Sequence, residues 1–101
     1  MKKRLIYLTG FMASGKSTIG PILANTLGWG FFDLDKVIEK DAGKSIRKIF
    51  EENGESYFRD TETDTLSKLS ILENFIISLG GGSVASEKNL EIIKTSGYLI
   101  Y

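Results

Sequence analysis

The chain has 101 residues, enough for one domain, and its 42% hydrophobic and 26% charged residues are typical of a soluble globular protein. Its 13 basic and 13 acidic residues balance, so no net charge attracts nucleic acid or an anionic membrane surface. Cysteine and histidine are absent, which excludes disulfides, thiolate chemistry and the usual zinc sites. Proton transfer must then use a carboxylate, lysine, tyrosine or water.

Apolar segments alternate with helical patterns along the whole chain. Strands are expected at residues 4–9, 30–32 and 75–79 and from residue 97 onward, and helices at 16–27, 35–43, 45–54, 55–70 and 86–94. The apolar run in the N-terminal MKKRLIYL is too short for the apolar region of a signal peptide. We therefore interpret this segment as the first strand of a cytoplasmic protein. The alternation predicts a three-layer α/β/α fold around a parallel sheet.

The segment TGFMASGKST, residues 9–18, joins the first strand to the first helix and fits the pattern G-x-x-x-x-G-K-[ST]. In a P-loop of this kind the backbone N–H groups surround a β-phosphate, the lysine bridges the β- and γ-phosphates, and the serine hydroxyl binds magnesium. A glycine-rich turn with an incidental lysine is the alternative, but it gives the lysine no packing role. The sequence therefore predicts a site for ATP and Mg²⁺, with the candidate residues Gly10, Ala13, Ser14, Gly15, Lys16, Ser17 and Thr18.

Two aspartates follow the second strand. Asp33 and Asp35 flank one leucine, so an extended backbone would direct both carboxylates to one face. One carboxylate would then hold magnesium through water, and the other would accept a hydrogen bond from a substrate hydroxyl. The alternative is that one of them caps the following helix, a role that is compatible with binding.

Two further features, an arginine and a glycine triplet, suggest a substrate site. Arg59, one of three arginines in the chain, is able to form a bidentate pair with a substrate carboxylate. Its alternative is an ion pair with Glu62 or Glu55. The glycines at 80–82 follow a buried strand and allow the backbone to approach a ligand, although a flexible turn has the same composition.

Taken in order, the stretches GFMASGKSTIG, FFDLDKVIE, IRKIFEENGESYFRDTE and LGGGSV resemble those of the shikimate kinases, a P-loop family of the nucleoside-monophosphate-kinase-like group. The resemblance spans about residues 5–84. It implies transfer of the ATP γ-phosphoryl group to the 3-hydroxyl of shikimate. Two small departures are Ala13 and Leu79, where the family often has glycine and threonine.

The resemblance also implies a role for each matched residue. Lys16 would contact the phosphates, and Asp33 would help to organise magnesium beside Ser17. Asp35 would hold the substrate hydroxyls and accept the proton. The carboxylate of shikimate would be bound by Arg59, and the remaining substrate contacts would come from the backbone of Gly80, Gly81 and Gly82.

Family members continue after the fourth strand into an arginine-bearing lid, a last strand and a C-terminal helix. We therefore expect residues 1–101 to form a single P-loop kinase domain that is incomplete at its C-terminus and poorly active. Two alternatives remain open: another small-molecule P-loop kinase, such as a gluconate kinase, and a nucleotide-binding fragment without turnover. The apolar final strand predicts self-association through its edge.

Overall fold

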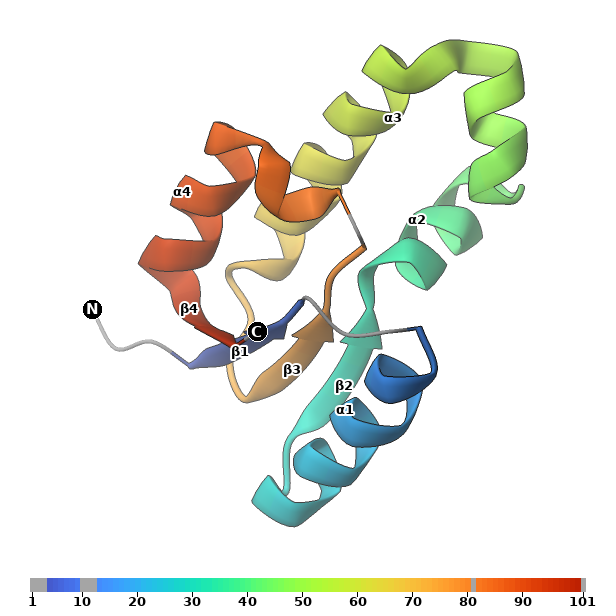
Figure 1. The fold of residues 1–101 in the computed structure, drawn as a ribbon. Helices are drawn as coiled ribbons and strands as arrows, with labels where there is room; N and C mark the ends of the chain where they lie inside the picture. The colour runs from blue at the N-terminus through green and yellow to red at the C-terminus, as the bar shows by residue number, and fades with distance from the viewer. Residues whose placement is uncertain (1–3, 10–12, 81, 101) are drawn as a thin grey trace.

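The computed structural model describes residues 4–9, 13–80 and 82–100, with residues 13–18 described in their backbone only (Figure 1). Strands and helices alternate as the sequence predicts. The elements are β1 (Leu5–Leu8), α1 (Ala13–Leu27), β2 (Gly30–Asp33), α2 (Leu34–Ala42), α3 (Ile46–Leu69), β3 (Phe75–Ser78), the short 3₁₀ helix η1 (Ser83–Ala85), α4 (Glu87–Ser96) and β4 (Gly97–Ile100). Within these ranges no helix is long and apolar enough to cross a membrane.

The four strands form one parallel sheet in the order β2-β3-β1-β4. The connection from β1 to β2 runs across the sheet in one direction, and the later connections return in the other. Because such crossovers are right-handed, reversing the direction places the connecting helices on the opposite face. Accordingly α1 covers one face, while α3 and α4 cover the other (Figure 1). This arrangement confirms the predicted three-layer fold.

Alternate residues of the central strands supply two separate cores, as expected for a sheet buried on both faces. Toward α1, Leu8 and Ile76 pack against Ala24. The larger core, toward α2, α3 and α4, contains Tyr7 and Ile77. Burial raises the pKa of the Tyr7 phenol, and its hydrogen bond to Ser96 Oγ (2.7 Å) partly offsets this.

Helix α3 is two helical segments joined at Gly54. Ser45 caps its start by accepting a hydrogen bond from the Lys48 N–H (3.2 Å), and Gly54 has φ 87° and ψ 170°, outside the helical region. Both features were predicted, because serine favours the N-cap and glycine tolerates positive φ. The bend directs the second segment back along the sheet (Figure 1), so residues after Gly54 come close to the loops beyond β3.

Candidate active site

The carboxyl ends of β1, β2 and β3 lie side by side at one edge of the sheet. Leu8 and Asp33 are both in register with Ser78. Beyond the strands, the Leu79 N–H donates to the Leu8 carbonyl (2.9 Å) and the Thr9 N–H to that of Ile100 (3.0 Å). The segments that carry the predicted site therefore leave the sheet from neighbouring points, which is where ligands bind in folds of this type.

The P-loop segment connects β1 to α1 at this edge. The sequence predicts a helix from Lys16, but α1 begins at Ala13. An earlier helix start is compatible with the predicted phosphate site, because the first four N–H groups of a helix have no partner within it and favour an anion. Gly10 lies outside the described residues. The backbone of residues 13–18 is helical, and their side chains, Lys16 and Ser17 among them, are outside the description.

The expectation of an extended backbone through Asp33 and Asp35 is wrong. Asp33 ends β2 and acts as the N-cap of α2, where its Oδ1 accepts from the N–H groups of Asp35 (3.0 Å) and Lys36 (3.4 Å). Capping starts the helix at once, so Asp35 lies in its first turn and the alternation of a strand does not apply. The cap bonds use Oδ1, and the N-capping that the sequence left as an alternative is present.

A cavity of about 150 Å³ lies where α2, α3 and the loop after β3 meet. Its polar wall includes Asp35, Arg59 and Glu62, and the remaining lining residues are Ile46, Phe50, Phe58, Gly80 and Gly82. Pockets for drug-sized ligands have volumes of roughly 300–1,000 Å³, so this cavity is small for a nucleotide. The apolar side chains, carboxylates and guanidinium of its wall suit a small molecule that has an apolar face and polar groups.

Two glycines leave room for the polar side chains that line the cavity. A Cβ atom at Gly80 would lie 2.7 Å from Asp35 Oδ1, and one at Gly82 would lie 2.6 Å from Arg59 Nη2. Neither distance is compatible with an unshifted side chain, so the absence of a Cβ lets the backbone lie directly against these two groups. Gly81 lies outside the described residues.

Gly82→Ala is expected to weaken binding at this cavity with little loss of stability. The atom that the new methyl meets is the end of a flexible side chain, so Arg59 moves while the backbone stays. A matched control is Gly43→Ala: Gly43 has φ 73° with open space around it, so alanine strains the backbone by about 1 kcal/mol and leaves the cavity intact. Urea unfolding and ligand titration of both variants should show opposite patterns. A Gly82→Ala protein with unaltered ligand affinity would contradict this account.

Arg59 forms both ion pairs that the sequence offered as alternatives to ligand binding. Its Nη1 lies 3.1 Å from Glu62 Oε1 and its Nε 3.8 Å from Glu55 Oε2. The guanidinium centre also lies 5.2 Å from the centroid of the Phe58 ring. These contacts engage Nη1 and Nε, while Nη2 faces Gly82. Because a guanidinium carries five N–H donors, the ion pairs orient the group without exhausting it.

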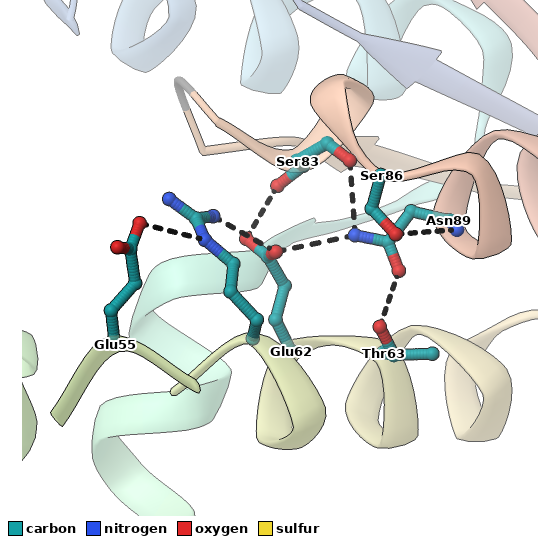
Figure 2. A network of polar contacts seen from close by, with 7 residues as sticks. Glu55, Glu62, Thr63, Ser83, Ser86 and Asn89 are labelled. Atoms are coloured by element: carbon teal, nitrogen blue, oxygen red, sulfur yellow. Dashed lines mark hydrogen bonds and ion pairs between the residues drawn. The ribbon is translucent and has the colours of Figure 1, made fainter. Parts of the chain in front are cut away.

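Sequence reasoning missed the polar network behind Arg59, which Figure 2 shows. Glu62 is 1% exposed, and its carboxylate accepts from three donors: Arg59 Nη1 (3.1 Å) and Asn89 Nδ2 (3.2 Å) on Oε1, and Ser83 Oγ (2.8 Å) on Oε2. A buried carboxylate needs such compensation. The sequence offered Glu62 only as an ion-pair partner, and no sequence signal distinguished Asn89 from a solvated residue of an amphipathic helix.

Of the two predicted magnesium ligands, the structure describes the side chain of Asp33, while that of Ser17 lies outside the description. No three acidic side chains gather to hold a metal ion among the residues the structure describes. Mg²⁺ is commonly bound through one or two protein oxygens, substrate phosphates and water, so it does not require such a cluster. Asp33, at the end of β2, lies at the same sheet edge as the P-loop segment.

The parallel sheet, the G-x-x-x-x-G-K-S segment that follows β1 and runs into the first turns of α1, and a small polar cavity at the same edge define the P-loop kinase fold. Within this class, the family model for shikimate kinase matches residues 12–101. The chain belongs to the shikimate kinase family.

Individual relatives agree with this assignment. A shikimate kinase from Chlorobium phaeobacteroides (strain DSM 266) is 56% identical over 97 residues, which are 96% of this chain and 51% of the relative. The structure of shikimate kinase from Acinetobacter baumannii in complex with shikimate matches with a TM-score of 0.92 and 39% identity, over 99% of this chain and 56% of the other. Shikimate kinase from Aquifex aeolicus matches with a TM-score of 0.86 and 47% identity, over 94% and 60%. The chain spans about half the length of the curated relatives it matches.

Proposed function

We propose that this chain binds ATP and shikimate and transfers the γ-phosphoryl group to the 3-hydroxyl of shikimate, as a cytoplasmic, single-domain P-loop kinase. The observation that carries the proposal is the cavity in which Asp35, Arg59, Gly80 and Gly82 meet. Its volume suits one small ring, and it lies beside the strand ends from which the P-loop segment leaves. The Acinetobacter baumannii relative, whose structure contains shikimate, supports the choice of substrate.

On the acceptor side, positioning is the main task, because phosphoryl transfer needs aligned reactants and neutralised charge. Arg59 binds the shikimate carboxylate, and the aromatic and aliphatic wall of the cavity supports the ring. The backbone of Gly80, Gly81 and Gly82 contacts the substrate. Asp35 accepts the proton of the 3-hydroxyl while the oxygen of that hydroxyl forms a bond to the γ-phosphorus. The bond from that phosphorus to the bridging oxygen breaks, and ADP leaves.

On the nucleotide side, the helix N-terminus and its loop hold the phosphates. Lys16 bridges the β- and γ-phosphates, while Gly10, Ala13, Ser14, Gly15 and Thr18 complete the loop around them. When bound, Mg²⁺ supplies positive charge against the phosphate oxygens. Ser17 would ligate it directly and Asp33 through water.

A second candidate function is binding without turnover. The sequence has three arginines: Arg4 precedes β1, Arg47 is 89% exposed in its side chain, and Arg59 lines the acceptor cavity. The charge that develops on the transferred phosphoryl group is thus left to Lys16 and the metal. For residues 1–101 taken by themselves, this favours slow turnover, or ligand binding alone, over efficient catalysis.

The test is ADP release from Mg²⁺-ATP with and without shikimate, using protein whose intact mass confirms that it ends at Tyr101. Shikimate-dependent release supports the kinase. Release that depends on gluconate or a nucleoside monophosphate instead would transfer the assignment to another small-molecule kinase. Binding of both ligands without release would leave the second candidate.

We also propose that copies of this chain associate through β4. This strand is an edge of the described sheet, and its residues Tyr98 and Ile100 are 57% and 41% exposed. Apolar edge strands favour pairing with another chain. Sedimentation at tens of micromolar should show a dimer that Ile100→Lys dissociates. A clean monomer in the unmodified protein would contradict the proposal.

A further inference from the structure

Asn89 is a buried residue whose side-chain amide connects α4 to α3 and η1, next to residues that line the cavity. It lies in α4 with 0% exposure. One neighbour, Glu62, is in α3, and another, Ser83, begins η1 directly after the glycine triplet. Figure 2 shows the Asn89 side chain pointing into the space between these elements. Its position is one that a hydrophobic residue normally fills in an amphipathic helix, so the amide requires a specific explanation.

All the hydrogen-bonding groups of this amide are used. Nδ2 donates to Glu62 Oε1 (3.2 Å) and to the Ser83 carbonyl (2.9 Å), while Oδ1 accepts from Thr63 Oγ1 (2.7 Å). A side chain with donors and acceptor satisfied in one geometry has a fixed orientation. Asn89 therefore holds α3 and η1 at a set separation.

The two hydrogen bonds that Asn89 Nδ2 donates fix groups on two sides of the Arg59 guanidinium. Glu62 Oε1 is the atom that also accepts from Arg59 Nη1, so fixing this oxygen fixes the guanidinium. The Ser83 carbonyl belongs to the turn that follows Gly82, whose backbone lies against Arg59 Nη2. Asn89 thereby positions both Glu62, the ion-pair partner of the guanidinium, and the Gly82 backbone that the guanidinium faces.

We propose that Asn89 is a positioning residue for carboxylate recognition: it orders Arg59 through Glu62 and sets the Gly82 wall through Ser83. The inference rests on the proposed function for the identity of the ligand. It predicts loss of affinity for shikimate without loss of affinity for ATP, since the contacts of Asn89 lie on the acceptor side of the site.

The main variant is Asn89→Leu, which fills similar space and removes every polar contact. Asn89→Ala is a second variant: it removes the same three hydrogen bonds without placing a larger apolar side chain or a new charge beside Glu62, so it tests the proposal if the leucine variant does not fold. The Kd for shikimate should rise about tenfold in either variant, as for one charge-assisted hydrogen bond, with the Kd for Mg²⁺-ATP unchanged.

Two controls separate positioning from general stability. Thr63→Val removes the hydrogen bond to Asn89 Oδ1 and leaves both donations in place. Tyr7→Phe removes the hydrogen bond to Ser96 at the other end of α4. Both should unfold at lower urea concentration than the unmodified protein, while their shikimate affinity changes less than about twofold.

A ligand-free measurement keeps the inference separate from the proposed function. The Nε–H signal of Arg59 in ¹H–¹⁵N NMR spectra should report an ordered side chain in the unmodified protein and in Thr63→Val, and a mobile one in the Asn89 variants. If the unmodified chain fails to bind shikimate, the proposed function fails and this signal alone decides the role of Asn89. Asn89 variants with an ordered Arg59 signal, or with the shikimate affinity of the controls, would overturn the inference.

Discussion

Arg59→Ala is expected to weaken shikimate binding about a hundredfold and to leave ATP binding unchanged, because a bidentate guanidinium–carboxylate pair is among the stronger single polar contacts. The structure adds a reason for a large effect. Arg59 is held by Glu62, Glu55 and the Phe58 ring before any ligand arrives. A preorganised group loses less entropy on binding, so more of its interaction energy contributes to affinity.

Arg59→Lys is the matched control for this prediction, since lysine keeps the charge but lacks the planar fork. Its affinity for shikimate should fall between those of the alanine variant and the unmodified protein. Lys16→Ala supplies the reciprocal case, with weakened ATP binding and nearly intact shikimate binding. Calorimetric titration of each ligand measures both effects. Unchanged shikimate affinity in Arg59→Ala would reduce Arg59 to an ion-pair partner of Glu62.

The fold could be predicted because its determinants are local in sequence. Buried strands appear as short apolar runs, and Ser45 and Gly54 mark helix boundaries through their own backbone preferences. The order of the strands follows less directly, but the crossover rule limits it to few arrangements. Aligned strand ends then bring Asp33 and the loop after Ser78 to one edge.

The wrong prediction of an extended backbone through Asp33 and Asp35 shows where prediction from local sequence fails. Spacing alone predicts that residues two apart share a face, but only if the strand continues. Here Asp33 binds the N–H of Asp35 and ends the strand itself, so one side chain changes the geometry of the next residues. The sequence contained both interpretations, and the competition between strand and cap was decided by a single local hydrogen-bonding pattern.

The network around Glu62 could not be predicted, because it depends on contacts between distant residues. Glu62 and Asn89 are 27 positions apart, and each has the appearance of an ordinary surface residue in its own helix. Their burial follows from how α3 and α4 pack against each other, which no local pattern specifies. Polar residues that become buried by packing are thus the part of the site that requires the structure.

Glu62→Ala is expected to destabilise the protein by about 2–3 kcal/mol, because it removes the acceptor for three donors in a buried place. Ser83 Oγ and Asn89 Nδ2 would lose a partner inside the protein. Arg59 is about one-third exposed and can turn toward water, which places the loss at the lower end of the range for broken buried pairs. For a small domain this is a large share of total stability.

Glu62→Gln separates charge from hydrogen bonding. The amide keeps a carbonyl oxygen for Arg59 and Asn89, and the Ser83 hydroxyl can rotate to accept from its NH₂ group. Glu62→Gln should lower the free energy of unfolding by about 1 kcal/mol, because its hydrogen bonds lose only their charge assistance. Urea unfolding of the two variants measures the difference, provided that the m-values agree with that of the unmodified protein. Equal destabilisation by alanine and glutamine would mean that the charge of Glu62 holds the three elements together, whereas a larger loss in alanine assigns that role to its hydrogen bonds.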